Sequence, residues 1–553
     1  MEEAVAVPQI MPLRTPKEAC EGPILPLRCE NALRSCLNIS CEVPCGGPRW
    51  SATRRMATME RMDSNTTAYA AVFDAGTTAL KGALVAADGR IVASGSEQLD
   101  LIIDGDRREQ DPGQWWRAFC LVSRHMLASA EAREPGFAAD RVAGIIFSGQ
   151  MQDLIALDGD LRPVRNAILY SDGRAERQAQ TLADAYCGGA DRFLAVVGNR
   201  LEGGLPLPKL MWLRDDEPES FAAIRHVLIS SKDYLIARLT GAAVGDVAAC
   251  TTAGAMDIHT GRWDAELCVA ASIDPAMLPR LHRPQDIVGK VGEPARQLTG
   301  FAAGTPVYAG IGDAGATTLA SGVSRPGEYN INLGTSGWIA TVSPEPFTDK
   351  PGAANLAFGV APGFVNAVPF LNAGDVHRWA SRVFAGADYG TAHDLIEGSR
   401  PGANGVLCLP YLVGERFPVM NPAIRGAYVG ISPDTTKADM LRAALEGVAF
   451  SIRQGMESFD APPETISLIG GGARESAWCQ IMADMLAHPV EVFANADILP
   501  AVALASLVFD KPGLIRDVCE SVVYAPRPAA ARAYDAVYPT FVTLYPAVDV
   551  VGR

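Results

Sequence analysis

AYAAVFDAGTTALKGALVAADG (68–89) and GEYNINLGTSGWIATVS (327–343) share one construction, which occurs once in each half of the chain. In each stretch, a β-branched or aromatic run ends in Gly-Thr-Thr or Gly-Thr-Ser, and a second apolar run follows at once. This pattern predicts a β-hairpin. Glycine lets the backbone approach a phosphate closely, and the hydroxyls and exposed N–H groups can donate hydrogen bonds to it. The two hairpins therefore predict two related halves that face one nucleotide.

Two other phosphate-binding patterns do not fit these stretches. A P-loop and a dinucleotide-binding fingerprint both place their glycines between a strand and a helix. Here an apolar, strand-like run follows each glycine turn, with no helical pattern in between. Both alternatives are therefore disfavoured.

Length and composition restrict the class of protein. The chain has 553 residues, of which 48% are hydrophobic and 20% charged, so it has room for two sizeable cores. No apolar run is long enough to cross a membrane. The net charge of −15 argues against a basic face for nucleic acid, and an anionic nucleotide then needs local donors and a metal ion. We expect a cytoplasmic enzyme that acts on a small molecule, with neither nucleic acid nor membrane as a partner.

The first 67 residues differ in character from the rest of the chain. Cysteines crowd this segment: Cys20, Cys29, Cys36, Cys41 and Cys45. They form no CxxC pair and have no His-rich partner, so a zinc site is disfavoured. A continuous apolar region of the kind found in secretory signals is also missing. We expect residues 1–67 to be a disordered extension, with Met56, Met59 and Met62 as alternative starts of translation.

From residue 68 onward, strand-like and helical patterns alternate, as in a layered α/β domain. Asp88-Gly89 is a two-residue turn signal that extends the first hairpin into a three-stranded antiparallel meander. Further strands are predicted over 141–147, 306–311 and 466–469, and helices over 174–185 and 437–459. The long helix over 437–459 is amphipathic, so we expect it to pack against the second sheet.

Together with the two hairpins, four further segments resemble the FGGY carbohydrate kinases, the sugar-kinase branch of the actin-like ATPase superfamily. They are 204–216 (first signature), 426–431 with 439–446 (second signature), 468–478 (adenosine-binding segment) and 170–174 (sugar-side motif of the xylulokinase group). The resemblance runs from about Tyr69 to beyond Leu507. It implies an α/β fold of two actin-like (ribonuclease H-like) ATPase domains with a central nucleotide and sugar cleft. We place the sugar-binding domain at 68–312 and the nucleotide-binding domain at 313–553.

The resemblance implies ATP-dependent phosphorylation of a sugar hydroxyl with Mg²⁺, and its motifs are closest to xylulokinase, which makes D-xylulose the leading acceptor. Other ketoses, polyols and sugar acids stay open as acceptors: ribulose, sedoheptulose, erythritol, glycerol and gluconate. A non-catalytic actin-fold ATPase is the alternative from another class. A homodimer is also left open.

Phosphoryl transfer requires that the γ-phosphate be positioned and its charge neutralised. In the first turn, Asp74 is a candidate ligand for Mg²⁺, which prefers carboxylate oxygens, and Thr77, Thr78 and Lys81 are candidate phosphate contacts. An Asx-turn is the alternative role of Asp74. Asp313, which follows a predicted strand, is a second candidate near the metal, with a turn or hinge role as its alternative.

The second half supplies the other candidate nucleotide contacts. Gly334, Thr335 and Ser336 form the turn of the second hairpin. Gly471, Gly472 and Ala473 follow a predicted strand, where small residues would allow adenine or ribose to lie against the backbone. Tight packing alone is the alternative explanation for these glycines.

The resemblance points to Asp246 as the catalytic general base, because such kinases carry a catalytic aspartate after a Lys-Asp-Tyr-Leu motif, found here at 232–235. A positioned carboxylate can accept the proton of the attacking hydroxyl. From the residues alone, an aspartate in a loop of small residues is more often a helix cap or a turn former.

The candidate sugar contacts are Gln150, Met151, Gln152, Asp172, Arg174 and Asp246. Xylulokinases usually have Gln-Met-His-Gly where this chain has Gln-Met-Gln-Asp (150–153), so Gln152 replaces a histidine. Because buried polar groups must find partners, such a change can redirect specificity. The residues 499–506 also depart from the family, which commonly has an acidic residue and more glycine there.

Overall fold

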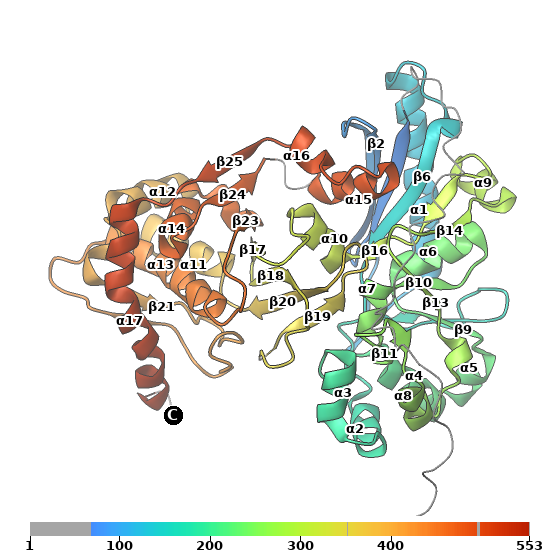
Figure 1. Ribbon diagram of the computed structural model, residues 1–553, viewed down its shortest axis with the longest axis horizontal. Helices are drawn as coiled ribbons and strands as arrows, with labels where there is room; N and C mark the ends of the chain where they lie inside the picture. Colours follow the sequence, from blue (N-terminus) through green and yellow to red (C-terminus); the bar gives the residue numbers. More distant parts are fainter. Residues whose placement is uncertain (1–67, 351, 495–497, 552–553) are drawn as a thin grey trace, which may run out of the picture. The chain divides into compact units, whose positions relative to one another are not determined.

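The computed structural model describes residues 68–350, 352–494 and 498–551 (Figure 1). The predictions made for residues 1–67, which concern the extension, its cysteines and the alternative starts, lie outside the described residues. The described residues belong to one compact unit.

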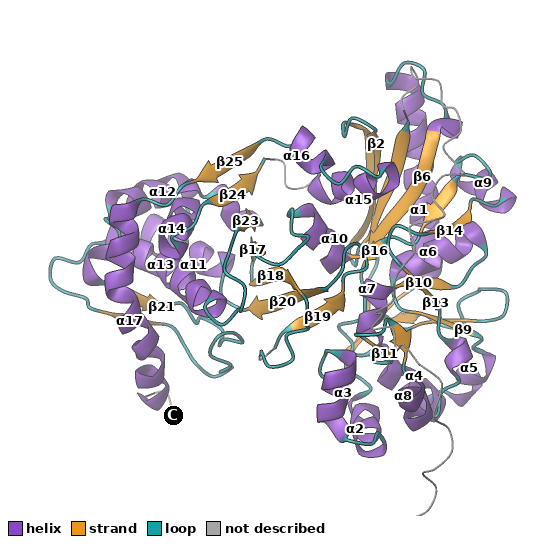
Figure 2. Cartoon of the chain, viewed as in Figure 1, coloured by secondary structure: helices purple, strands orange, loops and turns teal. Residues whose placement is uncertain are grey.

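The first sheet is built around the predicted meander. β1 (Tyr69–Ala75) pairs antiparallel with β2 (Ala79–Ala86), and β2 pairs antiparallel with β3 (Ile91–Gln98). β6 (Val142–Gly149) lies parallel to β1 on its other side. The strand order is β14-β15-β6-β1-β2-β3, in which β16 also pairs with β6 (Figure 2). The predicted meander and the strand after it are confirmed.

The stretch 306–311 was expected to form one strand, and this expectation is wrong. It divides into β15 (Pro306–Tyr308) and β16 (Ile311–Gly312). Gly310 lies between them with φ of 67°, and a Cβ there would be 2.1 Å from the carbonyl oxygen of Phe147. The chain bends where only glycine fits, and this bend positions the residue that follows β16.

Each face of the first sheet is covered by helices from different parts of the chain. Phe73 and the other inward side chains of β1 pack against α1 (Pro112–Arg133), with the Phe73 and Phe119 rings 4.6 Å apart. Val72, on the opposite face, belongs to the core of α15 (Leu499–Phe509), which packs on β1 and β6 (Figure 1). This alternation is the two-residue period of a strand.

The second sheet has the order β19-β20-β18-β17-β23-β24-β25. β17 (Glu328–Leu333) and β18 (Gly337–Ser343) form the second predicted hairpin, and β23 (Thr465–Ile469) lies parallel to β17. The remaining strands are β19 (Ala354–Ala357), β20 (Phe364–Phe370), β24 (Val490–Phe493) and β25 (Ser521–Tyr524).

The predicted long helix is α13 (Lys437–Met456), three residues shorter at its end than expected. Thr436 and Asp439 form a capping box at its start, in which each side chain accepts a hydrogen bond from the other residue's backbone. Its buried side belongs to one core with the strands β17 and β18, which confirms the expected packing on the second sheet.

The other elements are short and complete the two halves. The helices are α2 (Glu176–Ala185), α3 (Gly189–Val197), α4 (Pro206–Asp216), α5 (Pro218–Ala223), α6 (Ser231–Thr240), α7 (Val247–Cys250), α8 (Ala265–Ala271), α9 (Glu293–Thr299), α10 (Asp313–Ala320), α11 (Gly374–Ala385), α12 (Tyr389–Gly398), α14 (Ser476–Leu486), α16 (Leu514–Val518) and α17 (Pro528–Val551). The strands are β4 (Ile102–Asp104), β5 (Arg107–Gln110), β7 (Ile155–Leu157), β8 (Ala167–Ile168), β9 (His226–Leu228), β10 (Val244–Asp246), β11 (Met256–Asp257), β12 (Arg262–Trp263), β13 (Arg280–His282), β14 (Ile287–Lys290), β21 (Leu407–Leu409) and β22 (Ala427–Val429).

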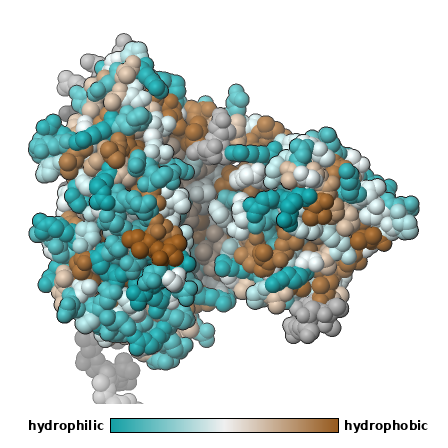
Figure 3. Space-filling model, turned by 180° about the vertical axis from the view of Figure 1, so that it is seen from behind, coloured by the Kyte–Doolittle hydropathy of each residue, from teal (hydrophilic) through white to brown (hydrophobic). Residues whose placement is uncertain are grey.

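The face of the molecule seen in Figure 3 is mostly hydrophilic, with apolar residues in scattered patches. Among the helices that the structure describes, none is both long and apolar enough to span a bilayer.

Candidate active site

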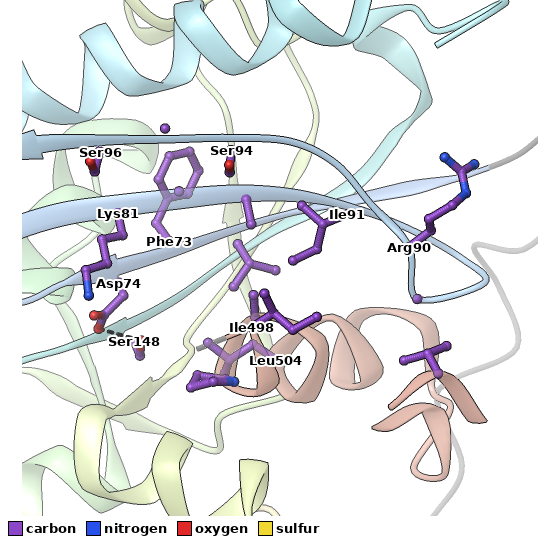
Figure 4. A pocket seen from close by; sticks show the side chains of 18 of the residues that line it. Phe73, Asp74, Lys81, Arg90, Ile91, Ser94, Ser96, Ser148, Ile498 and Leu504 are labelled. Carbon is purple, nitrogen blue, oxygen red and sulfur yellow. Dashed lines mark hydrogen bonds between the residues drawn. The ribbon is translucent and has the colours of Figure 1, made fainter. Parts of the chain in front are cut away.

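Asp74 stands at the end of β1, where two neighbouring strands bring partners to it. Its Oδ1 accepts a hydrogen bond of 2.8 Å from the Ser148 hydroxyl of β6, the residue paired with it across the parallel ladder. Lys81 of β2 is its partner across the antiparallel ladder. Asp74 is half-buried and Lys81 is exposed (Figure 4). A cation can therefore reach the carboxylate, and an anion can reach the ammonium group.

A network of three polar side chains fixes the first turn. The Thr77 hydroxyl donates to Gln150 Oε1 at 2.7 Å, Gln150 Nε2 donates to Gln110 Oε1 at 2.9 Å, and Gln110 Nε2 donates to the Thr77 carbonyl at 2.7 Å. Gln150 is only 1% exposed. Its predicted contact with sugar has no support in this geometry, because both ends of its amide already hold the turn. Thr78, at the tip, is exposed.

The second turn has the same form. Thr335 and Ser336 are exposed between β17 and β18, and Gly334 is half-buried. Two backbone hydrogen bonds join this turn to the start of α11. The Gly374 N–H donates to the Gly334 carbonyl at 2.7 Å, and the Asp375 N–H donates to the Thr335 carbonyl at 3.1 Å. Both turns therefore present hydroxyl groups on a rigid base, as phosphate binding requires.

A cavity of about 500 Å³ lies beside the glycine turn after β23. Gly471 and Ala473 line it, together with residues of α10 and the start of α15. Gly472 instead serves packing, because a Cβ there would lie 2.7 Å from the Trp478 ring. Two of the three residues predicted here to contact the nucleotide thus line a cavity of ligand size.

A larger cavity, of about 970 Å³, follows the face of β1, β2 and β3 (Figure 4). Asp74, Lys81 and Ser148 lie at one end of it, and α15 forms an apolar wall with Leu504 and its neighbours. Pro500 lines both cavities, so the departure from the family at 499–506 contributes to the wall of each.

Asp313 is the first residue of α10, directly after the bend at Gly310 and the strand β16. The Asp313 side chain is exposed, so a ligand can reach it. The protein packed around it nevertheless disfavours the charged form of the carboxyl group. This burial, with the negative charge of Asp74, raises the pKa of the Asp313 carboxyl to about 7. Its Oδ1 accepts from the Ala314 N–H at 2.7 Å, which leaves Oδ2 for a ligand.

Asp246 lies in a different environment from the one predicted for a base. It is 0% exposed. Its Oδ1 accepts from the N–H groups of Ala248 and Ala249, each at 3.0 Å, and so caps α7. Its Oδ2 forms an ion pair of 2.7 Å with Lys232. The geometry supports the role of helix cap, and the role of general base stays a prediction.

Asp172 and Arg174, both predicted sugar contacts, are bound to each other. Arg174 donates to Asp172 through Nε at 2.8 Å and Nη2 at 2.6 Å. It also forms an ion pair of 2.8 Å with Glu109, and its guanidinium lies 4.9 Å from the centre of the Trp212 ring. This arrangement fixes the loop after β8 and leaves Asp172 buried.

The other two predicted sugar contacts lie in the loop after β6. Met151 packs on the backbone before Asp313, since a Cβ on Gly312 would be 1.9 Å from the Met151 sulfur. Gln152 has a left-handed backbone with φ of 65°, and its Nε2 donates to Glu202 Oε1 at 3.2 Å. Glu202 was not predicted from the sequence, because it precedes the first signature and belongs to no pattern of its own.

The two hairpin turns of the same form and the two cavities beside the sheets fit a phosphotransferase with an alcohol group as acceptor. Residues 69–320 match the model of the N-terminal domain of the FGGY family of carbohydrate kinases, and residues 329–505 match that of the C-terminal domain. The protein belongs to the FGGY family of carbohydrate kinases. The two-domain fold predicted from the sequence is confirmed, whereas the boundary near Gly312 stays a prediction.

Relatives and solved structures agree with this assignment. The chain is 29% identical to xylulose kinase from Bacillus subtilis (strain 168), over 86% of this chain and 96% of that protein. It is 28% identical to gluconokinase from Bacillus licheniformis, over 87% and 96%. The crystal structure of xylulose kinase from Rhodospirillum rubrum superposes with a TM-score of 0.78 at 28% identity, covering 88% of this chain and 100% of that one.

Proposed function

We propose that the protein transfers the γ-phosphoryl group of ATP to a hydroxyl of a ketose, with D-xylulose as the leading acceptor. The relatives named xylulose kinase support this acceptor, and the two cavities beside the hairpin turns support a nucleotide as the donor. A cytoplasmic location and a homodimer stay predictions.

Asp313 carries the proposal. It is an accessible carboxylate near the first phosphate turn, its pKa of about 7 suits a general base at neutral pH, and its Oδ2 is open to a ligand. We assign it the role first given to Asp246: Oδ2 accepts the proton of the attacking hydroxyl. The alternative role of Asp313 is the one predicted from the sequence, a carboxylate near the metal ion.

The residues around Asp74 fit Mg²⁺. Asp74 raises the pKa of Asp313 through its charge, so the two carboxylates are close enough to interact. Mg²⁺ binds through one or two carboxylates and keeps several waters. When bound, the ion would neutralise charge on the phosphates. Lys81, Thr78 and the hydroxyls of Thr335 and Ser336 would hold the phosphate oxygens.

The experiment for this function is ADP release with Mg·ATP across D-xylulose, L-xylulose, D-ribulose, L-ribulose, sedoheptulose, erythritol, glycerol and gluconate. A strong response to D-xylulose that Asp313→Asn abolishes is expected. If ATP binds and no acceptor responds, the proposal fails and the non-catalytic ATPase becomes the better description.

The pKa of Asp313 sets the expected pH dependence. The carboxyl must be ionised to accept a proton, so kcat/KM for the sugar at low Mg·ATP should rise about tenfold per pH unit below pH 7 and level off above it. Mg²⁺ at Asp74 would offset the charge that raises this pKa, so a higher Mg²⁺ concentration should move the midpoint to lower pH. A rate that does not change between about pH 5 and about pH 8 would contradict this role for Asp313.

A further inference from the structure

The cavity beside the glycine turn after β23 lies next to the second hairpin turn. β17 and β23 are parallel and Asn332 pairs with Ile469, so the turns that follow these two strands leave the sheet at the same edge. A Cβ on Gly470 would lie 2.8 Å from Asn332 Oδ1, which shows how closely the two turns approach. A nucleotide with its phosphates at Thr335 and Ser336 would therefore have its nucleoside in this cavity.

The walls of this cavity are mostly apolar. Side chains from β23, β24 and α15 supply them: Leu468, Ile469, Val492, Phe493 and Leu499. Such walls suit the flat face of a base. Thr317 and Ser321 add hydroxyl groups, and Arg474 is the only charged residue among the described residues that line the cavity. A purine bound here would thus meet one guanidinium group.

Arg474 is exposed at the end of the short helical turn Gly471–Arg474. In the part of the chain that the structure describes, its guanidinium forms no hydrogen bond and no ion pair. The carboxylate next to it is already occupied, because Glu475 Oε1 accepts from the Ala477 N–H at 3.0 Å and lies 2.7 Å from His393 Nδ1. These contacts fix the backbone beside Arg474 and leave its N–H donors for a ligand.

The chemistry of a guanidinium group distinguishes between purines. It can only donate hydrogen bonds, and its planar fork donates them in pairs. Guanine and hypoxanthine present two adjacent acceptors, O6 and N7, whereas adenine presents the acceptor N7 beside a donor amino group. An arginine can therefore bind guanine and hypoxanthine through both atoms, but adenine through one.

Resting on the proposed kinase function, we infer that Arg474 contacts the purine base of the phosphoryl donor and that the protein accepts GTP and ITP as well as ATP. The edge of the base formed by O6 and N7 is the feature that Arg474 recognises. The reaction itself is the same for each donor. The bond between the γ-phosphorus and the bridging oxygen breaks, a bond from the sugar oxygen to that phosphorus forms, the hydroxyl proton is released, and GDP or IDP leaves in place of ADP.

The test compares GTP, ITP and ATP, each with Mg²⁺ and D-xylulose, on the full-length wild type, Arg474→Met, Arg474→Lys and the control Arg532→Met. In the wild type, kcat/KM for GTP and for ITP should lie within about tenfold of the value for ATP or above it. Arg474→Met should lower the ratio of GTP to ATP by about tenfold, the usual effect of losing a paired contact to a guanine. Arg474→Lys keeps the charge but loses the fork, so this ratio should fall by a similar factor. Arg532, exposed on α17, should have no effect.

Calorimetric titration of GDP and ADP without sugar keeps the outcome separate from catalysis. If GDP binds within about tenfold of ADP and Arg474→Met weakens GDP selectively, the inference stands even when no phosphate is transferred, and only the kinase proposal fails. The inference is overturned by a wild type that disfavours GDP and GTP by more than about tenfold, or by binding of neither nucleotide. Equal weakening of every nucleotide in Arg474→Met also overturns it, because that result would indicate a contact with phosphate, and so does an unchanged ratio.

Discussion

Asp313→Asn is expected to lower the rate of sugar phosphorylation by about 10² to 10⁴, the usual contribution of a general base. The amide has nearly the same shape as the carboxylate but cannot take the proton of the attacking hydroxyl. Nucleotide affinity should change little, because the two hairpin turns and the glycine turn after β23 are untouched. Steady-state assays with D-xylulose, combined with titration of Mg·ATP, would measure both quantities.

Asp246→Asn is the matched control, because Asp246 is the other candidate for the same role. The amide can still cap α7, but it removes one of the two carboxylates bound to Lys232, so we expect a loss of stability. If Asp246→Asn abolished phosphorylation in a protein of unchanged stability while Asp313→Asn remained active, the assignment of the base would return to Asp246.

The second large effect is expected from Lys232→Met. Lys232 is 0% exposed and forms ion pairs with Asp233 and Asp246, which are also 0% exposed. Burial opposes its charge, but the two carboxylates outweigh burial and raise the pKa of Lys232 above its usual range. Without the lysine, two buried carboxylates lose their shared counter-ion. Breaking such a pair typically costs about 3 to 5 kcal/mol.

Urea denaturation of the wild type, Lys232→Met and the exposed control Lys290→Met would measure this loss. The midpoint of Lys232→Met should fall clearly below those of the other two proteins. A change equal to that of Lys290→Met would show that the buried cluster contributes little to stability, and would leave Asp246 free of the structural role assigned to it.

The local elements were predictable because their signals are local. The two hairpins follow from strand-forming runs around short turns, and α13 follows from the spacing of its apolar residues. The glycine turn after β23 was identified for the same reason. In contrast, the sequence 306–311 has the pattern of one strand. The break at Gly310 was not predictable, because it depends on the close approach of Gly310 to Phe147, a residue far away in the chain.

The roles of the acidic residues were not predictable in the same way. Asp246 ends one short strand and Asp313 follows another, so nothing local separates a helix cap from an accessible carboxylate. Lys232, near Asp246 in space, makes one of them part of a buried ion cluster. Asp74, from the first hairpin, raises the pKa of the other. Each role depends on charges brought together by folding.

The sequence by itself determined the family, the two hairpin turns and the class of reaction, because short segments with strong local patterns carry each of them. The tertiary structure alone decided that α15 packs on the first sheet, that Gln150 braces Thr77, and that Glu202 meets Gln152. The physical reason is that burial, ion pairing and ligand access depend on neighbours distant in sequence, and no local pattern records those neighbours.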